Sequence, residues 1–263
     1  MRTETIQGKR IEYSDAIGFG KTVIDVHKGL KSKDIHTVKN TLLVTATYNP
    51  NQANNTFKEK LDITTWLPSA SKEYKTSPDI SDYIFVPVFT IPSDLPNRNS
   101  VAFPLQALTE YSVSAGRLGY KTFKGKPCHL EHDNQDPTKA YGVIADCSLR
   151  RLNGFGGGKV WKLMELLAID RSKHPGIANK ILRREYNSYS MGAMVSRYTC
   201  SICNANITAR STCGHVGPPG TLDFKEFSGN LAYKKVWGVD GIETSIVATP
   251  AFSTATSDWL MTF

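Results

Sequence analysis

Two extended segments in the middle of the chain constrain its fold more than any other feature. Apolar residues occupy every second position from Tyr141 to Leu149, the period of two that is typical of a β-strand with one apolar face. A glycine-rich turn at 153–158 follows, and Lys159 to Ile169 again favours a strand. Because a strand must bury its apolar face against a partner, the chain has to contain a substantial sheet.

Weaker signals extend this interpretation to both sides. His174-Pro175 predicts the start of a helix, with proline in the first turn. The polar stretch from Ser69 to Asp79 predicts an exposed loop. Further strands are expected at Leu42–Tyr48, Tyr83–Ile91 (where Pro87 indicates an edge or a bulge), Ser188–Val195 and Gly238–Thr249. The predicted class is therefore α+β and strand-rich, a β-barrel or sandwich with helices at its periphery.

Composition narrows the class of protein. The chain has 263 residues, enough for one large domain or two small ones, and 40% hydrophobic residues exclude a wholly disordered protein. No run approaches the roughly 20 apolar residues of a membrane-spanning helix, so no membrane partner is expected. The N-terminus lacks an apolar signal-peptide core and the five cysteines are odd in number, which together favour a reducing cytoplasm.

The charge is basic but spread along the chain. Lysine and arginine number 32 against 24 aspartate and glutamate, a formal net charge of +8. This permits an acidic partner without requiring one. The basic residues form no stripe interleaved with aromatics, as single-strand binders use for stacking, so nucleic acid is not expected as the main partner.

A cluster of cysteines indicates a metal site. Cys200, Cys203, Cys213 and His215 place three thiols and an imidazole within sixteen residues. A C-x-x-C turn lets two thiolates bind one Zn²⁺, and C-x-H supplies two more ligands for a closed tetrahedral site. Such a zinc ion would be structural, because no open position remains for water. The alternative is ordinary buried thiols beside an unrelated histidine; Cys128 and Cys147 are left over, and Cys147 is expected to pack in the core.

Two apparent motifs fail on inspection. The segment 153–160 lacks the spacing and the Ser/Thr of a phosphate-binding loop, and His129-Leu-Glu-His132 does not fit a zinc peptidase. What remains is serine and histidine chemistry: small residues follow Ser190, and His132 opens a turn-rich segment. The residues alone do not choose Ser190 over Ser188, and they do not name a third catalytic member.

Four pieces in order do resemble a known family. They are Gly125-Lys-Pro-Cys-His-Leu-Glu-His132-Asp133, Tyr141-Gly142-Val143, Ser190-Met-Gly192, and the segment from Gly241 through Glu243 and Ser245 to Ala251. This set resembles the prohead (capsid-maturation) serine proteases of tailed bacteriophages, over about Tyr120 to Phe252. The cysteine cluster looks like an insertion at 198–217 seen in some of these proteins, including those of larger phages. Residues 1–100 match nothing in the pattern, so their role within a single protease domain of 1–263 stays open.

The resemblance implies a fold and roles. The fold would be a herpesvirus-protease-like β-barrel surrounded by helices. Ser190 would be the nucleophile, His132 its general base and Glu243 the third member, with Asp240 as the competitor for that place.

The implied activity is endopeptidase cleavage of phage scaffold, capsid and internal proteins inside the assembling prohead in the host cytoplasm. Relatives often cut after glutamate, which makes Glu73 the first candidate for self-cleavage and Glu110 the second. A homo-oligomer is left open. The competing hypotheses are a zinc-containing nucleic-acid-binding virion protein and an inactive capsid-assembly scaffold that has kept the protease fold.

Overall fold

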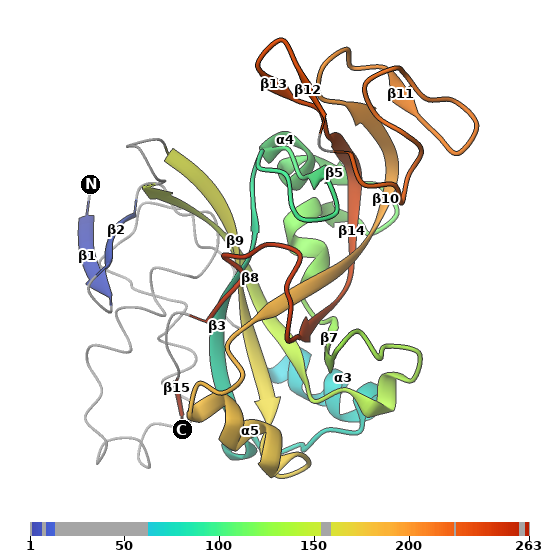
Figure 1. The fold of residues 1–263 in the computed structure, drawn as a ribbon. Helices are drawn as coiled ribbons and strands as arrows, with labels where there is room; N and C mark the ends of the chain where they lie inside the picture. The colour runs from blue at the N-terminus through green and yellow to red at the C-terminus, as the bar shows by residue number, and fades with distance from the viewer. Residues whose placement is uncertain are drawn as a thin grey trace.

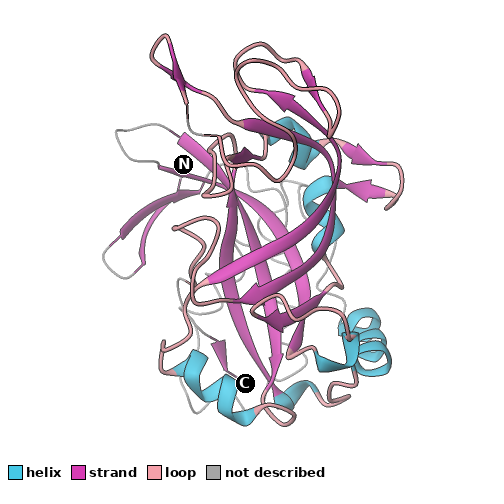
Figure 2. Cartoon of the chain, turned by 45° about the vertical axis from the view of Figure 1, so that its right-hand side comes forward, coloured by secondary structure: helices cyan, strands magenta, loops and turns pink. Residues whose placement is uncertain are grey.

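A computed structural model describes residues 2–6, 9–13, 63–153, 159–223, 225–257 and 261–262 (Figure 1). Within them the protein is α+β and strand-rich, as predicted, with few helices (Figure 2). The strand expected at Leu42–Tyr48 lies outside the described residues. None of the described helices has the length and apolar character needed to cross a membrane.

One large mixed sheet dominates the structure. Its strands follow the order β11, β10, β14, β7, β8, β9, β3 and β15, and β4 also pairs with β14. Their bounds are β3 (Tyr83–Pro92), β4 (Val101–Ala102), β7 (Pro127–Leu130), β8 (Gly142–Asn153), β9 (Lys159–Asp170), β10 (Tyr189–Cys200), β11 (Asn206–Ile207), β14 (Lys234–Ile246) and β15 (Met261–Thr262). Strands β7 and β4 run parallel to β14, whereas the other neighbours are antiparallel.

Smaller elements surround this sheet. Three two-stranded sheets pair β1 (Arg2–Ile6) with β2 (Lys9–Tyr13), β5 (Tyr111–Ser112) with β6 (Arg117–Leu118), and β12 (Glu226–Phe227) with β13 (Asn230–Leu231). The described α-helices are α3 (Ile63–Tyr74), α4 (Leu105–Thr109) and α5 (Pro175–Leu182). Short 3₁₀ turns cover 80–82, 119–123 and 137–139.

The strands expected in the middle of the chain are confirmed. Strands β8 and β9 pair from Gly142 to Asn153, and β9 pairs on its other side with β3, which carries Pro87 and an irregularity between Phe89 and Pro92. The predicted helix begins at Pro175, with His174 as its N-terminal cap residue. The late strands are also confirmed, although β10 and β14 are longer than predicted.

The loop predicted from Ser69 to Asp79 is wrong in its first half, because α3 continues to Tyr74. Trp66, Ala70 and Tyr74 recur every four residues and are all buried. This spacing places them on one face of a helix, so the polar residues between them occupy the solvent side. The helical period begins at Trp66, upstream of the polar stretch, so the polar stretch taken alone does not show it.

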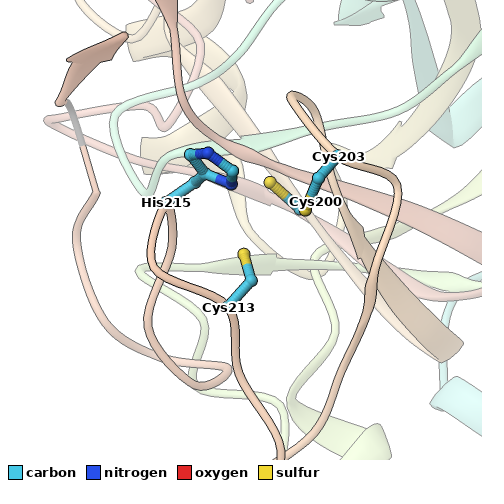
Figure 3. Close-up of side chains that lie close together, drawn as sticks. All are labelled: Cys200, Cys203, Cys213 and His215. Carbon is cyan, nitrogen blue, oxygen red and sulfur yellow. The ribbon is translucent and has the colours of Figure 1, made fainter.

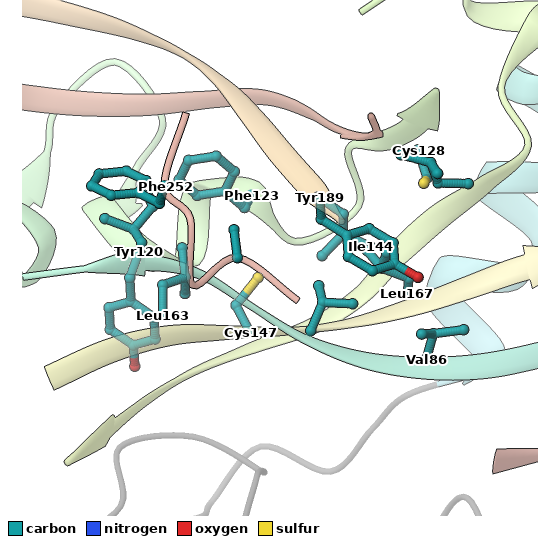
Figure 4. Close-up of a cluster of buried hydrophobic side chains, with 14 of the residues drawn as sticks. Val86, Tyr120, Phe123, Cys128, Ile144, Cys147, Leu163, Leu167, Tyr189 and Phe252 are labelled. Carbon is teal, nitrogen blue, oxygen red and sulfur yellow. The ribbon is translucent and has the colours of Figure 1, made fainter. Parts of the chain in front are cut away.

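The sheet curls around a large buried core. Side chains from β3, β8, β9, β10 and β14 meet in one buried cluster, in which Cys147 and Cys128 pack as small apolar residues (Figure 4). The segment 255–257 links the ends of the curl. The Tyr189 N–H donates to the Ala255 carbonyl, and the Phe89 N–H donates to the Thr256 carbonyl. The first residues of β10 are thereby held close to β3.

Strands β10 and β14 continue along the core as a long antiparallel pair (Figure 1). The segment between them, residues 201–233, forms β11, β12 and β13 at the far tip. We call residues 200–233 the tip module. At the core end, the register of the pair shifts between Gly192 and Ala193, where β14 carries one extra residue. Bulges of this kind change the direction in which neighbouring side chains point.

Candidate active site and metal centre

One face of the sheet gathers the predicted catalytic residues at the core end of β10 and β14. Ser190 lies directly opposite Ser245, and Gly192 lies opposite Glu243. On the other side of β14, His129 of β7 pairs with Ser245. Because directly paired residues and residues two apart share a face of a sheet, all five point to the same side.

Glu243 is fully buried and both of its carboxylate oxygens are engaged. Oε1 lies 2.5 Å from Nδ1 of His132, and Oε2 accepts a hydrogen bond of 2.5 Å from the Ser245 hydroxyl. A Cβ built on Gly192 would meet Oε1 at 3.1 Å. The absence of a side chain at Gly192 thus makes room for the carboxylate to lie against β10.

His132 stands just beyond the end of β7, in a backbone conformation that L-residues rarely adopt. Glu131 and His132 have φ angles of 50° and 60°. The turn is held by the Glu131 N–H, which donates to the Ile246 carbonyl, and by the His132 N–H, which donates to the Ser245 hydroxyl at 3.2 Å. Strained backbone of this kind is concentrated at functional sites. Here it places the ring against Glu243 with 43% of the side chain still exposed.

The partner carboxylate changes the basicity of His132. The hydrogen bond to Glu243 raises the pKa of His132 above 6.5, against the opposing effect of partial burial. A histidine that donates Nδ1–H to a carboxylate keeps Nε2 free to accept a proton, which is the tautomer a general base requires.

Ser190 is 8% exposed. Among the described residues it makes no hydrogen bond to His132. Hydrogen bonds between a nucleophile and its base are often loose without substrate. Ser190 nevertheless shares the face of the ion pair and lies two residues from Gly192, against which Glu243 rests.

The alternatives considered from sequence lie elsewhere. Asp240 pairs with Met194, on the far side of the bulge from Glu243, and Ser188 lies before β10 and bridges to Thr256. Of the two self-cleavage candidates, Glu73 is in the last turn of α3 and not in a loop. Glu110 follows α4 and accepts a hydrogen bond from the Gly238 N–H at 2.7 Å.

Sequence reasoning missed two members of this face. Ser245 was only part of a pattern, although its spacing of two from Glu243 on a strand would have placed both on one side. His129 was considered only as part of a zinc-peptidase motif. It is 1% exposed, and neither ring nitrogen has a hydrogen-bond partner among the described residues. Burial lowers the pKa of His129, so the ring is neutral at pH 7.

The predicted metal ligands come together at the far tip. Cys200, Cys203, Cys213 and His215 bring their ligand atoms within 4.8 Å of one another, and they could hold a metal ion such as zinc (Figure 3). Cys200 ends β10, and its sulfur accepts the N–H of Ile202 at 3.3 Å, as in a thiolate knuckle. His215 stacks edge-on against Phe227 with ring centroids 4.7 Å apart.

The cluster favours thiolate at one position. Burial raises the pKa of the Cys213 thiol, but the N–H groups of Val216 and His215, the His215 ring and the Cys200 thiol outweigh it, and the pKa falls to about 6. Since metals bind the thiolate form, this ligand needs no proton loss at neutral pH. Burial raises the pKa of Cys200, whose proton must therefore leave when a metal binds.

The metal cluster and the serine–histidine face are far apart. Ser190 is at the start of β10 and Cys200 at its end, a separation of roughly 33 Å at the usual rise of a strand. A metal at the tip therefore cannot reach the Ser190 hydroxyl.

A buried carboxylic acid lies on the opposite, core side of β14. Glu165 is fully buried and accepts a hydrogen bond of 2.6 Å from Thr244. Burial raises the pKa of Glu165 to about 8 from 4.5. Between these values the folded protein holds a proton that the unfolded chain has lost, so stability falls as the pH rises through this range.

Glu165→Gln is expected to remove the loss of stability that the wild type shows as the pH rises. At pH 5 the variant and the wild type should unfold at similar denaturant concentrations. At pH 9 the variant should be more stable by up to about 4 kcal/mol, since it buries no charge. Chemical denaturation at both pH values measures the difference, with the exposed Glu226→Gln as the matched control. Equal stability differences at pH 5 and pH 9 would contradict the assignment.

No protein-family model matches the chain, and comparisons with curated proteins and with solved structures likewise find no match.

Proposed function

We propose that the protein is a serine endopeptidase in which Ser190 is the nucleophile, His132 the general base and Glu243 the residue that orients the base. The observation that carries the proposal is the pairing of His132 with a buried carboxylate on the face that also bears Ser190. A serine hydroxyl is a weak nucleophile unless a base takes its proton. The Glu243 carboxylate favours this role by holding the ring in one tautomer and stabilising the imidazolium that forms.

In the proposed acylation step, Ser190 Oγ attacks the carbonyl carbon of the scissile peptide bond while its proton passes to Nε2 of His132. The tetrahedral intermediate then breaks the C–N bond, and His132 returns the proton to the leaving amine. Water hydrolyses the resulting ester by the same route, with His132 again as base.

The biological role follows from the resemblance to prohead proteases. We infer that the substrates are scaffold, capsid and internal proteins of a tailed phage, cut during prohead maturation, and that the protein cleaves itself. The curled sheet linked through 255–257 is compatible with a herpesvirus-protease-like barrel. Glu73 is exposed but lies in the last turn of α3, so cleavage there would require the end of the helix to unwind.

The metal at the tip is proposed to be a structural zinc ion. All four ligands come from the protein, which leaves no open position for water. The tip module gives little support to nucleic-acid binding, because residues 201–233 carry two basic residues, Arg210 and Lys225, against two acidic ones, Asp223 and Glu226.

An alkyl fluorophosphonate probe tests the nucleophile without a known substrate. The wild-type chain is expected to be labelled at Ser190, where Oγ attacks phosphorus, fluoride leaves and His132 takes the proton. Ser190→Ala should abolish labelling, whereas Ser188→Ala, its matched control, should retain it. Intact mass of the wild type against Ser190→Ala then reports self-cleavage. A wild-type chain that is neither labelled nor able to cut candidate capsid proteins would identify an inactive scaffold instead.

A further inference from the structure

The hydroxyl of Ser245 is the common point between the base and its orienting carboxylate. Ser245 is fully buried in β14, the strand between β10 and β7. Its Oγ donates to Oε2 of Glu243 at 2.5 Å and accepts the backbone N–H of His132 at 3.2 Å. These contacts and the bond from Glu243 Oε1 to Nδ1 of His132 form a closed ring of hydrogen bonds.

We propose that Ser245 is a positioning residue of this site, whose hydroxyl fixes the Glu243 carboxylate and the His132 turn in one arrangement. Only the expected effect of Ser245 on kcat rests on the proposed function. A glutamate side chain has three rotatable bonds, and fixing it in one rotamer costs conformational entropy that hydrogen bonds to its oxygens offset. Without Ser245, Oε2 would remain buried and without a donor, which is unfavourable for a charged group.

The position of Ser245 in the sheet keeps its hydroxyl, and the hydrogen bonds that it makes, in a fixed place. Its strand is paired on both sides at this point, with Ser190 on one side and His129 on the other. His132 has no such support, since it lies beyond the end of β7 in a left-handed turn. The hydrogen bond from His132 to the Ser245 hydroxyl thus fixes His132, which lies in a turn, to a strand that is rigid because it is paired on both sides. Supporting hydrogen bonds have this effect in preorganised sites.

The same contacts exclude Ser245 as a second nucleophile. Its single hydroxyl proton is committed to Glu243, and the side chain is inaccessible to solvent. Ser245 therefore acts through Glu243 and His132 and does not touch substrate.

The ring pKa of His132 tests the proposal independently of peptidase activity. We would measure it by NMR on the full chain carrying Ser190→Ala, which prevents self-cleavage. Adding Ser245→Ala is expected to lower the His132 pKa toward 6.5, because the carboxylate that raises it is no longer held; Glu131 adds only a smaller contribution. Thr244→Val is the matched control. It removes a buried hydroxyl from the residue before Ser245 on β14, where the side chain points to the opposite face of the sheet and bonds to Glu165.

The kinetic arm uses the active chain. Ser245→Ala should lower kcat about tenfold or more, the equivalent of losing one hydrogen bond of about 1.4 kcal/mol in the transition state, with little change in KM. Ser245→Thr, which keeps the hydroxyl, should recover most of the rate. An unchanged His132 pKa in Ser245→Ala, or an equal fall in Thr244→Val, would overturn the positioning role. A lowered His132 pKa in Ser245→Ala, together with no peptidase activity in the chain that retains Ser190, would uphold the positioning role and refute the proposed function.

Discussion

Replacing Glu243 with glutamine is expected to lower kcat for peptide hydrolysis by about three to four orders of magnitude, the loss seen when the carboxylate of a serine-protease triad becomes an amide. The side chain keeps its size, so the buried position opposite Gly192 is retained. The amide, however, can present a donor to Nδ1 of His132 and stabilise the wrong tautomer. The acidic limb of the pH–rate profile should also move to lower pH, because the carboxylate that raises the His132 pKa is gone.

Asp240→Asn is the matched control for this experiment. It makes the same chemical change three residues earlier on β14, at the other carboxylate considered for the third catalytic place. Asp240 pairs with Met194 beyond the bulge, so its replacement should change kcat by less than about threefold. Steady-state kinetics over pH 5–9 separate the two residues. A larger effect at Asp240 than at Glu243 would refute the proposed triad.

The strands were predictable where their pattern is local. The alternation from Tyr141 and the β-branched run from Tyr83 identify β8 and β3 because burial on a sheet imposes a period of two. The helix α3 was missed because its buried residues, Trp66 to Tyr74, are separated by polar ones that look like a loop when taken alone. The curl of the sheet depends on pairing between segments as distant as Tyr189 and Ala255, which no local pattern contains.

The candidate site residues were also predictable only where the pattern is local. The metal ligands were predictable because all four lie within sixteen residues, and at this spacing a short loop can bring them together. The choice of Glu243 over Asp240 was not, because it depends on which carboxylate reaches His132, a residue 111 positions away in the sequence. The left-handed turn at Glu131 and His132 was equally hidden, since glutamate does not favour it and two of the hydrogen bonds that hold it come from β14, far away in the sequence.

Removing the metal is expected to unfold the tip module while leaving the proposed catalytic face, which bears Ser190, His132 and Glu243, in place. The module has a small core of its own, made of Cys200, Ile207, Val216 and Ala232, and two of its ligands come from a long loop. A core of this size does not order some thirty residues without a metal or disulfides, and structural zinc supplies about 10–16 kcal/mol in small domains. A strong chelator, or Cys203→Ser, should therefore expose 201–233 to proteolysis and lower the Tm by roughly 10 °C.

The distance between the sites turns this experiment into a test of what the metal does. Elemental analysis should find one zinc per wild-type chain, less in Cys203→Ser, and an undiminished amount in Cys147→Ala, whose thiol packs in the main core. Because Ser190 and Cys200 lie at opposite ends of β10, fluorophosphonate labelling of Ser190 should persist in the metal-free chain below its melting temperature. A metal-free chain that stays folded but loses labelling would place the metal in the chemistry, against a structural role. Loss of protease resistance with labelling retained would mean that β10 and β14 hold the catalytic face through the main core alone, and that the tip module folds as a separate metal-dependent unit.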